Sequence, residues 1–250
     1  MNSLLESITG NSSGIGAAIA IKFAELGAKV TIVGRNEKKL NNVAKKCNNP
    51  LVIVADVTKE GDLKKIVNET LKRFGKLDIL VNNAGIVQKT TINEENAMEA
   101  YKNVMATNLH SVVQLTHLAV PHIIKTKGNI VNISSVAGLS VSFKFSTGFP
   151  YHTSKAGLDH FTRSIASELA SNGVRVNSVN PGPVKTDIME NMGVGEPDAA
   201  WEETKKNTAL GRFSESEEIA DLVAFLASEK ARGITGSIFV SDNGALVKAN

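Results

Sequence analysis

The sequence has few of the residues that mark several large classes of protein. Cys47 is the single cysteine in 250 residues, so the chain can form no internal disulfide and suits a reducing compartment. No apolar run approaches the roughly 18 residues that a membrane-spanning helix needs. Met1–Gly10 contains Glu6 and no basic cluster, unlike a secretory signal. We therefore expect a cytoplasmic protein without a membrane partner.

The excess of charge of one sign is also small. Lysine and arginine number 28 against 25 acidic residues, a net charge of +3, and the basic residues are scattered along the chain. Scattered charges are typical of a solvated surface, whereas a nucleic-acid partner requires them to be clustered. Hydrophobic residues make up 42% of the chain, enough for a sizeable core. We expect neither a nucleic-acid partner nor a metal site.

A regular alternation of two patterns fills the chain. Short apolar runs rich in β-branched residues are typical of parallel strands buried on both faces, and longer helical patterns separate them. The alternation predicts parallel βαβ units. We expect an α/β single-domain Rossmann fold over residues 1–250, with a doubly wound parallel sheet of about seven strands and helices on both faces. The expected strands are Ser3–Ile8, Lys29–Val33, Leu51–Ala55, Leu77–Val81, Asn129–Ile133, Val174–Val179 and Ser237–Val240, and the expected helices are 14–27, 36–47, 59–74, 96–125, 151–172 and 215–228.

Residues 185–208 interrupt this alternation. The segment holds two glycines, a proline, two methionines and the only tryptophan of the chain. A long irregular stretch inside a compact domain is often functional, so we expect a substrate-binding lid here.

A glycine-rich turn precedes the first expected helix. Thr9–Gly16 reads TGNSSGIG. Glycines let the backbone approach a pyrophosphate closely, and a helix N-terminus offers N–H groups and a favourable dipole. An ordinary glycine-rich loop is the alternative. The candidate cofactor contacts are Gly10, Ser12, Ser13, Gly14, Ile15 and Gly16.

The end of the second expected strand indicates which dinucleotide is bound. An acidic residue at this place would bind the ribose 2′-hydroxyl and favour NAD. The sequence instead has Gly34 followed by Arg35, and a guanidinium suits a 2′-phosphate. We expect NADP(H), with Arg35 and Asn36 as contacts, while NAD(H) stays possible. A surface arginine at the start of a helix is the alternative.

Two further strands end in small or polar residues. Asp56 and Val57 follow the third strand, and Asn82–Gly85 follow the fourth. As an alternative, each group can simply form an ordinary turn, since small and polar residues are common in turns. Together with the glycine turn they lie along one sheet edge, which favours a cleft, and we count Asp56, Val57, Asn83, Ala84 and Gly85 among the cofactor contacts.

Tyr151 and Lys155 can form an acid–base pair. Residues four apart share a helix face. A phenol has a pKa near 10, and a nearby cation lowers that pKa, so the pair suits general acid–base catalysis at neutral pH. Upstream, the strand Asn129–Ile133 is followed by two hydroxyls, and Ser135 can donate to a substrate oxygen as negative charge develops. A plain helix face and an ordinary turn are the alternatives.

In their order, these motifs resemble those of the short-chain dehydrogenase/reductase family, NADP(H)-preferring type, over nearly the whole chain. The matching positions are Thr9–Gly16, Asp56, Asn82–Gly85, Asn108, Ser135, Tyr151 with Lys155, and Asn180–Val184 followed by Thr186. By itself, Asn108 would be read as a helix residue that bonds locally.

The resemblance implies roles for these residues. Tyr151 would exchange a proton with the substrate oxygen, Lys155 would lower the phenol pKa and hold the nicotinamide ribose, and Ser135 would polarise the substrate. Asn108 would hold a water that links Lys155 to solvent. Family members form homotetramers or homodimers, which we expect here. Contacts to the nicotinamide would come from Pro181, Gly182, Val184 and Thr186.

The sequence departs from the family pattern at two places that bear on the site. Glu6 and Ser7 stand in the first strand where apolar residues are usual, and a buried unpaired carboxylate is costly, so we expect a distorted N-terminus. Extra residues in Ser142–Pro150 predict a longer loop beside the substrate.

We therefore predict hydride transfer between nicotinamide and a carbonyl or secondary alcohol, with NADPH-dependent reduction of a lipophilic ketone as the activity. Six apolar side chains can line the pocket, although core or lid packing explains them equally well. A 3-oxoacyl-thioester reductase, a broad carbonyl reductase and a non-catalytic dinucleotide-binding sensor or scaffold are the alternatives. The six side chains are Phe143, Phe145, Phe149, Met189, Met192 and Trp201.

Overall fold

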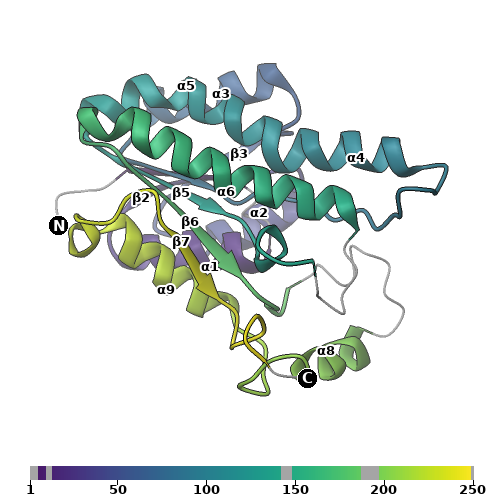
Figure 1. The fold of residues 1–250 in the computed structure, drawn as a ribbon. Coiled ribbons are helices and arrows are strands. Elements are labelled where there is room, and N and C mark those ends of the chain that lie inside the picture. Colours follow the sequence, from purple (N-terminus) through teal and green to yellow (C-terminus); the bar gives the residue numbers. More distant parts are fainter. Residues whose placement is uncertain (1–4, 10–12, 142–147, 187–196, 249–250) are drawn as a thin grey trace.

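A computed structural model describes residues 5–9, 13–141, 148–186 and 197–248. Seven parallel strands form one sheet in the order β3-β2-β1-β4-β5-β6-β7 (Figure 1). The strand order reverses beside β1, and ligands of open α/β sheets bind at such switch points, outside the carboxyl ends of the strands. The predicted doubly wound parallel sheet is confirmed. The strands are β1 Leu5–Thr9, β2 Lys29–Gly34, β3 Leu51–Val54, β4 Ile79–Asn82, β5 Asn129–Ile133, β6 Arg175–Pro181 and β7 Ile238–Ser241.

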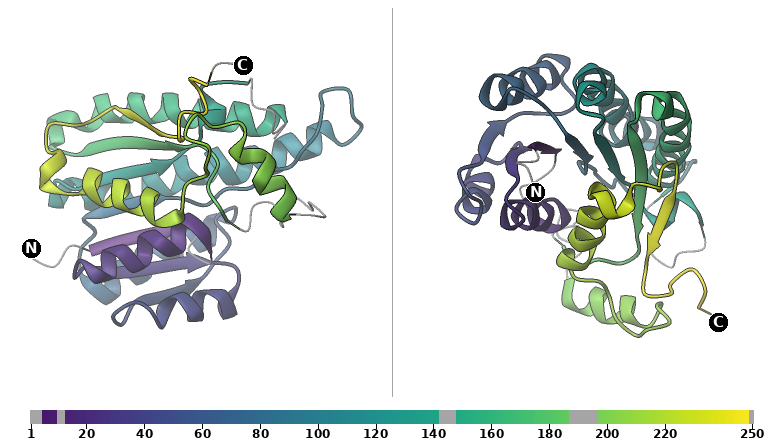
Figure 2. Two further views of the ribbon diagram at one scale, coloured as in Figure 1. Left: turned by 90° about the horizontal axis from the view of Figure 1, so that it is seen from below. Right: turned by 90° about the vertical axis from the view of Figure 1, so that its left-hand side faces the viewer.

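Helices cover both faces of the sheet (Figures 1 and 2). α1 (Gly14–Glu25), α2 (Glu37–Ala44) and α9 (Ser216–Ala227) pack on one face, and α3 (Glu60–Phe74), α5 (Ser111–Thr126) and α6 (Phe149–Leu169) pack on the other. Neighbouring residues of one strand therefore enter different cores: Ile32 packs with the α1 layer and Val33 with the α3 layer. This explains the nearly continuous apolar runs of the central strands, because helices cover both of their faces.

The first strand forms despite its polar residues. The backbone of Leu5–Thr9 pairs in parallel register with β2, and Glu6, Ser7 and Ile8 also pair with β4. The distortion that we predicted is therefore not seen in the backbone of these residues, since ladder hydrogen bonds are independent of the side chain.

Two helical predictions need correction. The single helix expected over 96–125 is divided into α4 (Ala97–Met105), a π-helical turn at Ala106–His110 and α5. Within the segment expected to be irregular, Pro197–Lys205 form helix α8, as a proline in the first turn followed by good helix formers permits. In the part of the chain that the structure describes, no helix is long and apolar enough to cross a membrane.

Arg175 joins the start of β6 to the end of α9. Its guanidinium donates to the carbonyl oxygens of Leu226 at 2.8 Å, Ser228 at 3.2 Å and Ile234 at 3.3 Å. The last carbonyls of a helix have no partner within the helix. The cation satisfies them and complements the helix dipole, so it fixes α9 against the sheet.

We expect Arg175→Ala to lower the free energy of unfolding by about 2–3 kcal/mol, because several partly buried carbonyls lose a charged donor. Urea unfolding followed by circular dichroism measures this. The exposed Arg232 serves as the matched control, and Arg232→Ala should change stability by less than about 0.5 kcal/mol. Equal effects of the two substitutions would show that Arg175 has no special structural role.

Candidate active site

A cleft of about 220 Å³ opens at the carboxyl edge of the sheet. Its walls come from the ends of β5 and β6, from the segments that follow β4, β5 and β6, from the first turn of α1, from the first two turns of α6, and from α8. It is lined by Ile15, Asn83, Gly85, Ile86, Val87, Ile133, Ser134, Ser135, Val136, Ala137, Tyr151, Lys155, Pro181, Gly182, Pro183, Val184, Thr186, Trp201 and Thr204.

The cleft gathers twelve of the residues that the sequence singled out. These are Ile15, Asn83, Gly85, Ser135, Tyr151, Lys155, Pro181, Gly182, Pro183, Val184, Thr186 and Trp201. Asn108, Ser13, Gly14, Gly16, Ala84, Arg35, Asn36, Asp56 and Val57 are not among the lining residues. Gly10 and Ser12 lie outside the described residues.

The glycine turn and Thr186 lie against each other. Gly14 has a φ of +55°, and a Cβ built on it would lie 2.7 Å from Cγ2 of Thr186. Only glycine tolerates both the conformation and the contact. Ser13, the residue before α1, makes no side-chain cap hydrogen bond, and the first turn of α1 has no acidic residue. This helix end therefore fits an anionic group such as a pyrophosphate.

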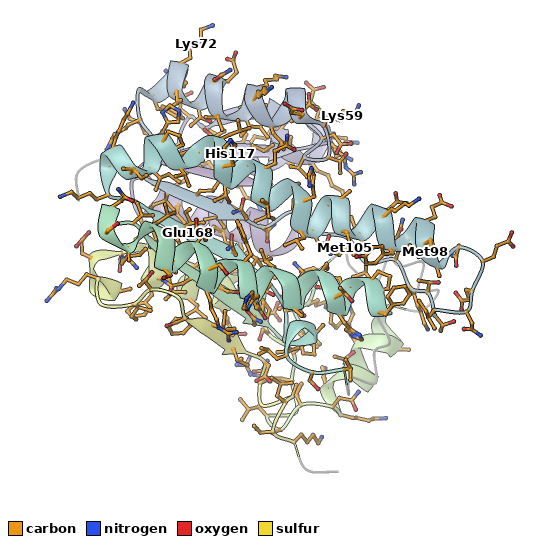
Figure 3. All side chains as sticks on the ribbon, turned by 45° about the horizontal axis from the view of Figure 1, so that its top comes forward. Lys59, Lys72, Met98, Met105, His117 and Glu168 are labelled. Atoms are coloured by element: carbon orange, nitrogen blue, oxygen red, sulfur yellow. The ribbon has the colours of Figure 1, made fainter. Side chains whose placement is uncertain are left out.

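Cations gather at the ends of β2 and β3. The Asp56 carboxylate accepts hydrogen bonds from the Thr58 amide at 3.0 Å and the Thr58 hydroxyl at 2.7 Å. These bonds hold the pKa of Asp56 below its usual value, and the charges of Arg35 and Lys59 lower it further. Arg35 is exposed, and Lys59 lies at the start of α3 (Figure 3). Both cations therefore lie close enough to Asp56 to stabilise its negative charge.

Asn36 has a structural role in this arrangement. Its side-chain oxygen accepts a hydrogen bond from the Lys39 amide at 3.0 Å and so caps α2. The contact to the cofactor that we predicted for Asn36 stays a prediction.

Ser135 and Tyr151 meet in the cleft. Ser135 follows β5 and caps the 3₁₀ turn η2 (Val136–Gly138), its hydroxyl accepting from the Ala137 amide at 3.1 Å. Tyr151 lies in the first turn of α6 and its phenol hydrogen-bonds to Ser135. Burial raises the pKa of Tyr151 above its usual value, and the bond to Ser135 opposes this rise.

Lys155 lies beside the tyrosine ring but does not bond to the phenol. Its Nζ is 5.6 Å from the ring centroid and donates to the carbonyl oxygen of Ile133 at 2.8 Å. Burial lowers the pKa of Lys155 to about 8, and the charge of Asp159 opposes the decrease. The sequence predicted that Lys155 would lower the pKa of Tyr151. In this structure the pKa of Tyr151 is raised instead, because the loss of hydration dominates.

The π-helical turn places Asn108 behind Lys155. The buried amide accepts from the Ile86 N–H at 2.8 Å and donates to the Ile86 carbonyl at 2.9 Å and to Ser154 Oγ at 3.1 Å. The local helix bonding considered for Asn108 is therefore wrong. π-Helical turns occur frequently at functional sites. Asn108 therefore fixes the segment after β4 against α6. Gly85, in that segment, lies close to both side chains, since a Cβ on it would be 3.6 Å from Asn108 Oδ1 and from Lys155 Nζ.

The aromatic residues divide between cleft and packing. Trp201 of α8 lines the cleft and packs at 5.4 Å against Phe213. Phe149 instead stacks on Tyr101 at 6.1 Å and is not among the lining residues. Phe143, Phe145, Met189 and Met192 lie outside the described residues.

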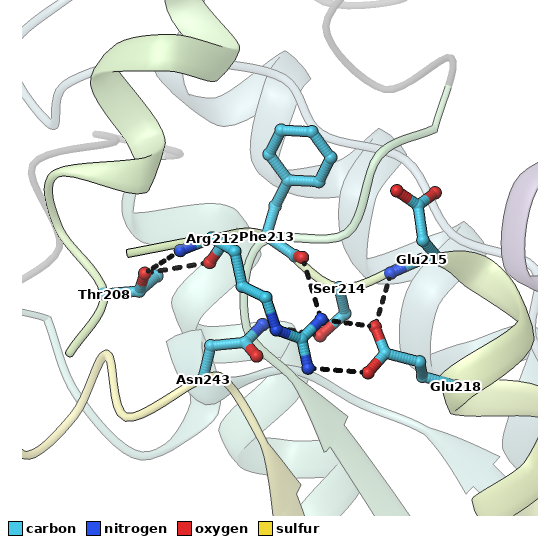
Figure 4. A network of polar contacts seen from close by, with 7 residues as sticks. All are labelled: Thr208, Arg212, Phe213, Ser214, Glu215, Glu218 and Asn243. Atoms are coloured by element: carbon cyan, nitrogen blue, oxygen red, sulfur yellow. Dashed lines mark hydrogen bonds and ion pairs between the residues drawn. The ribbon is translucent and has the colours of Figure 1, made fainter. Parts of the chain in front are cut away.

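A polar network holds Phe213 in position (Figure 4). Arg212 forms a bidentate ion pair with Glu218, with two contacts of 2.8 Å. The main-chain N–H of Arg212 donates to Thr208 Oγ1, and the Thr208 hydroxyl donates to the carbonyl oxygen of Arg212. Asn243 donates to Ser214 Oγ at 2.8 Å. Phe213 follows Arg212 in the chain and packs against Trp201. The network therefore supports this wall of the cleft.

Sequence reasoning missed Ile86, Val87, Ile133, Ser134, Val136, Ala137 and Thr204 as lining residues. Most of them directly follow strands that end at the cleft. The rule that ligands bind beyond the carboxyl ends of parallel strands would have found them. Thr204 gave no such signal, because its place depends on how α8 packs.

Comparisons with known proteins agree with this geometry. A family model described as enoyl-(acyl carrier protein) reductase matches residues 9–245. A tropinone reductase homolog of Arabidopsis thaliana is 38% identical over 248 residues, covering 96% of this chain and 91% of the relative. L-fucose dehydrogenase of Bos taurus is 35% identical over 240 residues, covering 95% of this chain and 87% of the relative. A 3-oxoacyl-[acyl-carrier-protein] reductase of Thermotoga maritima is 34% identical, with 96% of each chain covered.

Solved structures resemble the whole chain. A short-chain dehydrogenase/reductase of unknown function from Caenorhabditis elegans, crystallised with cofactor, superposes with a TM-score of 0.92 at 34% identity and covers 99% of this chain and 96% of its own. Glucose dehydrogenase of the same organism, in its apo form, gives a TM-score of 0.83 at 38% identity, with 98% of each chain covered. With the parallel sheet and the cleft at its carboxyl edge, these matches show that the chain belongs to the short-chain dehydrogenase/reductase family, whose members are oxidoreductases acting on alcohols and carbonyls with NAD(P)(H).

Proposed function

We propose that the chain is an NADPH-dependent reductase of lipophilic ketones. The observation that carries the proposal is the meeting of Tyr151, Ser135 and Lys155 in one cleft whose remaining walls are mainly apolar. The apolar side chains suit a substrate with few hydroxyl groups, because buried sugar hydroxyls would need polar partners. The apolar side chains that line the cleft are those of Ile15, Ile86, Val87, Ile133, Val136, Ala137, Val184 and Trp201.

The bound nicotinamide would supply the hydride to the carbonyl carbon. Tyr151 gives its proton to the carbonyl oxygen, and a raised pKa keeps the phenol protonated at neutral pH, as reduction requires. The Ser135 hydroxyl donates a hydrogen bond to the same oxygen as its negative charge grows. Lys155 lies beside the ring and stabilises the phenolate that remains. A water held by Asn108 stays a prediction.

Segment 185–208 would serve as the lid of the substrate side. Its described helix α8 contributes Trp201 and Thr204 to the cleft wall, and both side chains are buried. Residues 187–196 lie outside the described residues.

Two other substrate classes are favoured by relatives. The Thermotoga maritima relative is named a 3-oxoacyl-[acyl-carrier-protein] reductase, and the Bos taurus relative an L-fucose dehydrogenase. A panel of apolar cyclic ketones, a 3-oxoacyl thioester and L-fucose, assayed with each cofactor, separates them. We expect the largest kcat/KM for the apolar ketones with NADPH. Failure of every apolar ketone would refute the lipophilic proposal.

Tyr151→Phe should lower kcat by about 10²–10⁴-fold, the range expected when a general acid is removed. NADPH affinity should change by less than about twofold, since one hydroxyl is lost without a change of charge. Stopped-flow turnover and a fluorescence titration measure the two quantities. Tyr101→Phe, at the only other tyrosine, is the matched control and should leave kcat unchanged. Normal turnover of Tyr151→Phe would support a non-catalytic role for Tyr151.

Arg35→Ala should weaken NADPH binding by roughly 10–100-fold, the loss of one charged hydrogen-bonding partner. NADH affinity should stay the same, because NADH has no 2′-phosphate. Titration of nicotinamide fluorescence with each cofactor measures both. The exposed neighbour Lys38 provides the control variant Lys38→Ala. An equal loss for NADPH and NADH would show that Arg35 does not read the 2′-phosphate.

A further inference from the structure

A buried carboxyl lies behind the site and has no place in the mechanism above. Asp159 is on α6, four residues after Lys155 and eight after Tyr151, so the three share a helix face. The residue is 3% exposed. The turn η2 lies directly on it, since a Cβ on Gly138 would be 2.8 Å from Asp159 Oδ2. A carboxyl buried this deeply needs hydrogen-bond partners.

Two residues of β6, Ser178 and Asn180, bond to this carboxyl. Asn180 Nδ2 donates to Asp159 Oδ2 at 2.8 Å and to the carbonyl oxygen of Ser135 at 2.9 Å. Because this nitrogen lies between two acceptors, the orientation of the amide is settled. The amide oxygen of Asn180 therefore faces Ser178 Oγ, at 2.6 Å.

The number of hydrogens then determines the state of the carboxyl. Ser178 has one hydroxyl hydrogen, and at 2.6 Å it must be donated to Asn180 Oδ1. Yet Ser178 Oγ is also 3.2 Å from Asp159 Oδ1. With an ionised carboxylate, this second contact would join two oxygens without a hydrogen. A protonated Asp159 supplies the missing hydrogen and closes a ring: Asp159 donates to Ser178, Ser178 to Asn180, and Asn180 back to Asp159.

The surroundings agree with a neutral acid. Burial raises the pKa of Asp159, against the opposing effects of its hydrogen bonds and of Lys155. Ser134, the other hydroxyl beside the carboxyl, has its hydrogen directed to the Lys155 carbonyl oxygen at 3.2 Å, although it also interacts with Asp159. When Asp159 is protonated, the Ser134 hydroxyl does not have to donate to the carboxyl and to the Lys155 carbonyl oxygen at the same time.

We propose that Asp159 is a positioning residue whose neutral carboxyl, through the ring with Ser178 and Asn180, fixes the main chain of Ser135 and thereby aims the hydroxyl that polarises the substrate oxygen. The proposal rests on the proposed function for its effect on turnover. Asn180 is the link, because one amide nitrogen bonds both the carboxyl and the Ser135 carbonyl. A small displacement of a group that contacts the reacting atoms can cost up to about 10²-fold in rate.

Three variants test the ring. Asp159→Ala removes the carboxyl, and Ser178→Ala removes only one hydroxyl. Both should lower kcat by about tenfold or more. NADPH affinity and the ketone KM should change by less than about twofold, because neither residue lines the cleft. Asp159→Asn should retain kcat within about threefold, since a side-chain amide can donate to Ser178 and accept from Asn180 as the neutral acid does.

Thr162→Val is the matched control for a buried hydroxyl on the same helix. Thr162 Oγ1 bonds to Asn132 Nδ2 at 2.9 Å and has no bond to the ring. The substitution should lower stability without lowering kcat. A loss of kcat equal to that of Ser178→Ala would show that any buried hydroxyl lost from this region has the same effect, and would overturn the proposal.

Infrared difference spectroscopy of wild type against Asp159→Asn tests the proton without any substrate. We expect a protonated-carboxyl stretching band at neutral pH that the variant lacks. Absence of the band, or a kcat of Asp159→Asn as low as that of Asp159→Ala, would refute the neutral ring. If wild type turned over no carbonyl compound, the proposed function would fail while the band still decided the state of Asp159.

Discussion

The close packing of α6 against the ends of β5 and β6 is the constraint on which the site depends. The backbone of η2 approaches α6 so closely that a Cβ on Gly138 would lie 2.8 Å from the Lys155 carbonyl carbon. Ser134 and Ser178 bond across the same contact. Because Tyr151 and Lys155 belong to α6 and Ser135 follows β5, this contact fixes their relative positions. The catalytic groups are thus held by a helix and two strand ends, as precise placement demands.

The second constraint is the shared carboxyl edge of a parallel sheet. Every strand of the sheet runs in the same direction, so the segments after β1, β4, β5 and β6 all emerge at one edge. The glycine turn, Asn83 and Thr186 are far apart in the chain but lie together for this reason. The covered faces of the sheet make the arrangement rigid, since each strand contributes alternate residues to two separate cores.

Much of this arrangement could be predicted. Alternating patterns specify the elements, and the strand ends specify the edge, so the amino-acid sequence suffices to assign Ile15, Gly85, Ser135 and Tyr151 to the cleft. The π-helical turn was not predicted, because the amphipathic pattern of 96–125 is continuous and the bonds of Asn108 in this turn are to Ile86, which lies 22 residues away. The pKa of Tyr151 was predicted in the wrong direction, since the sequence shows the neighbouring cation but not the burial that opposes it.

By itself, the sequence determined the parallel α/β fold, the glycine turn, and the spacing that puts Tyr151, Lys155 and Asp159 on one helix face. These are local properties, set by the periodicity of apolar residues and by the conformations that glycine permits. Tertiary structure alone decided that Asp159 bonds to Asn180 and Ser178, and that Trp201 lines the cleft and packs against Phe213. Such contacts depend on side-chain packing between distant segments, where distances of a few tenths of an ångström decide which hydrogen bonds form.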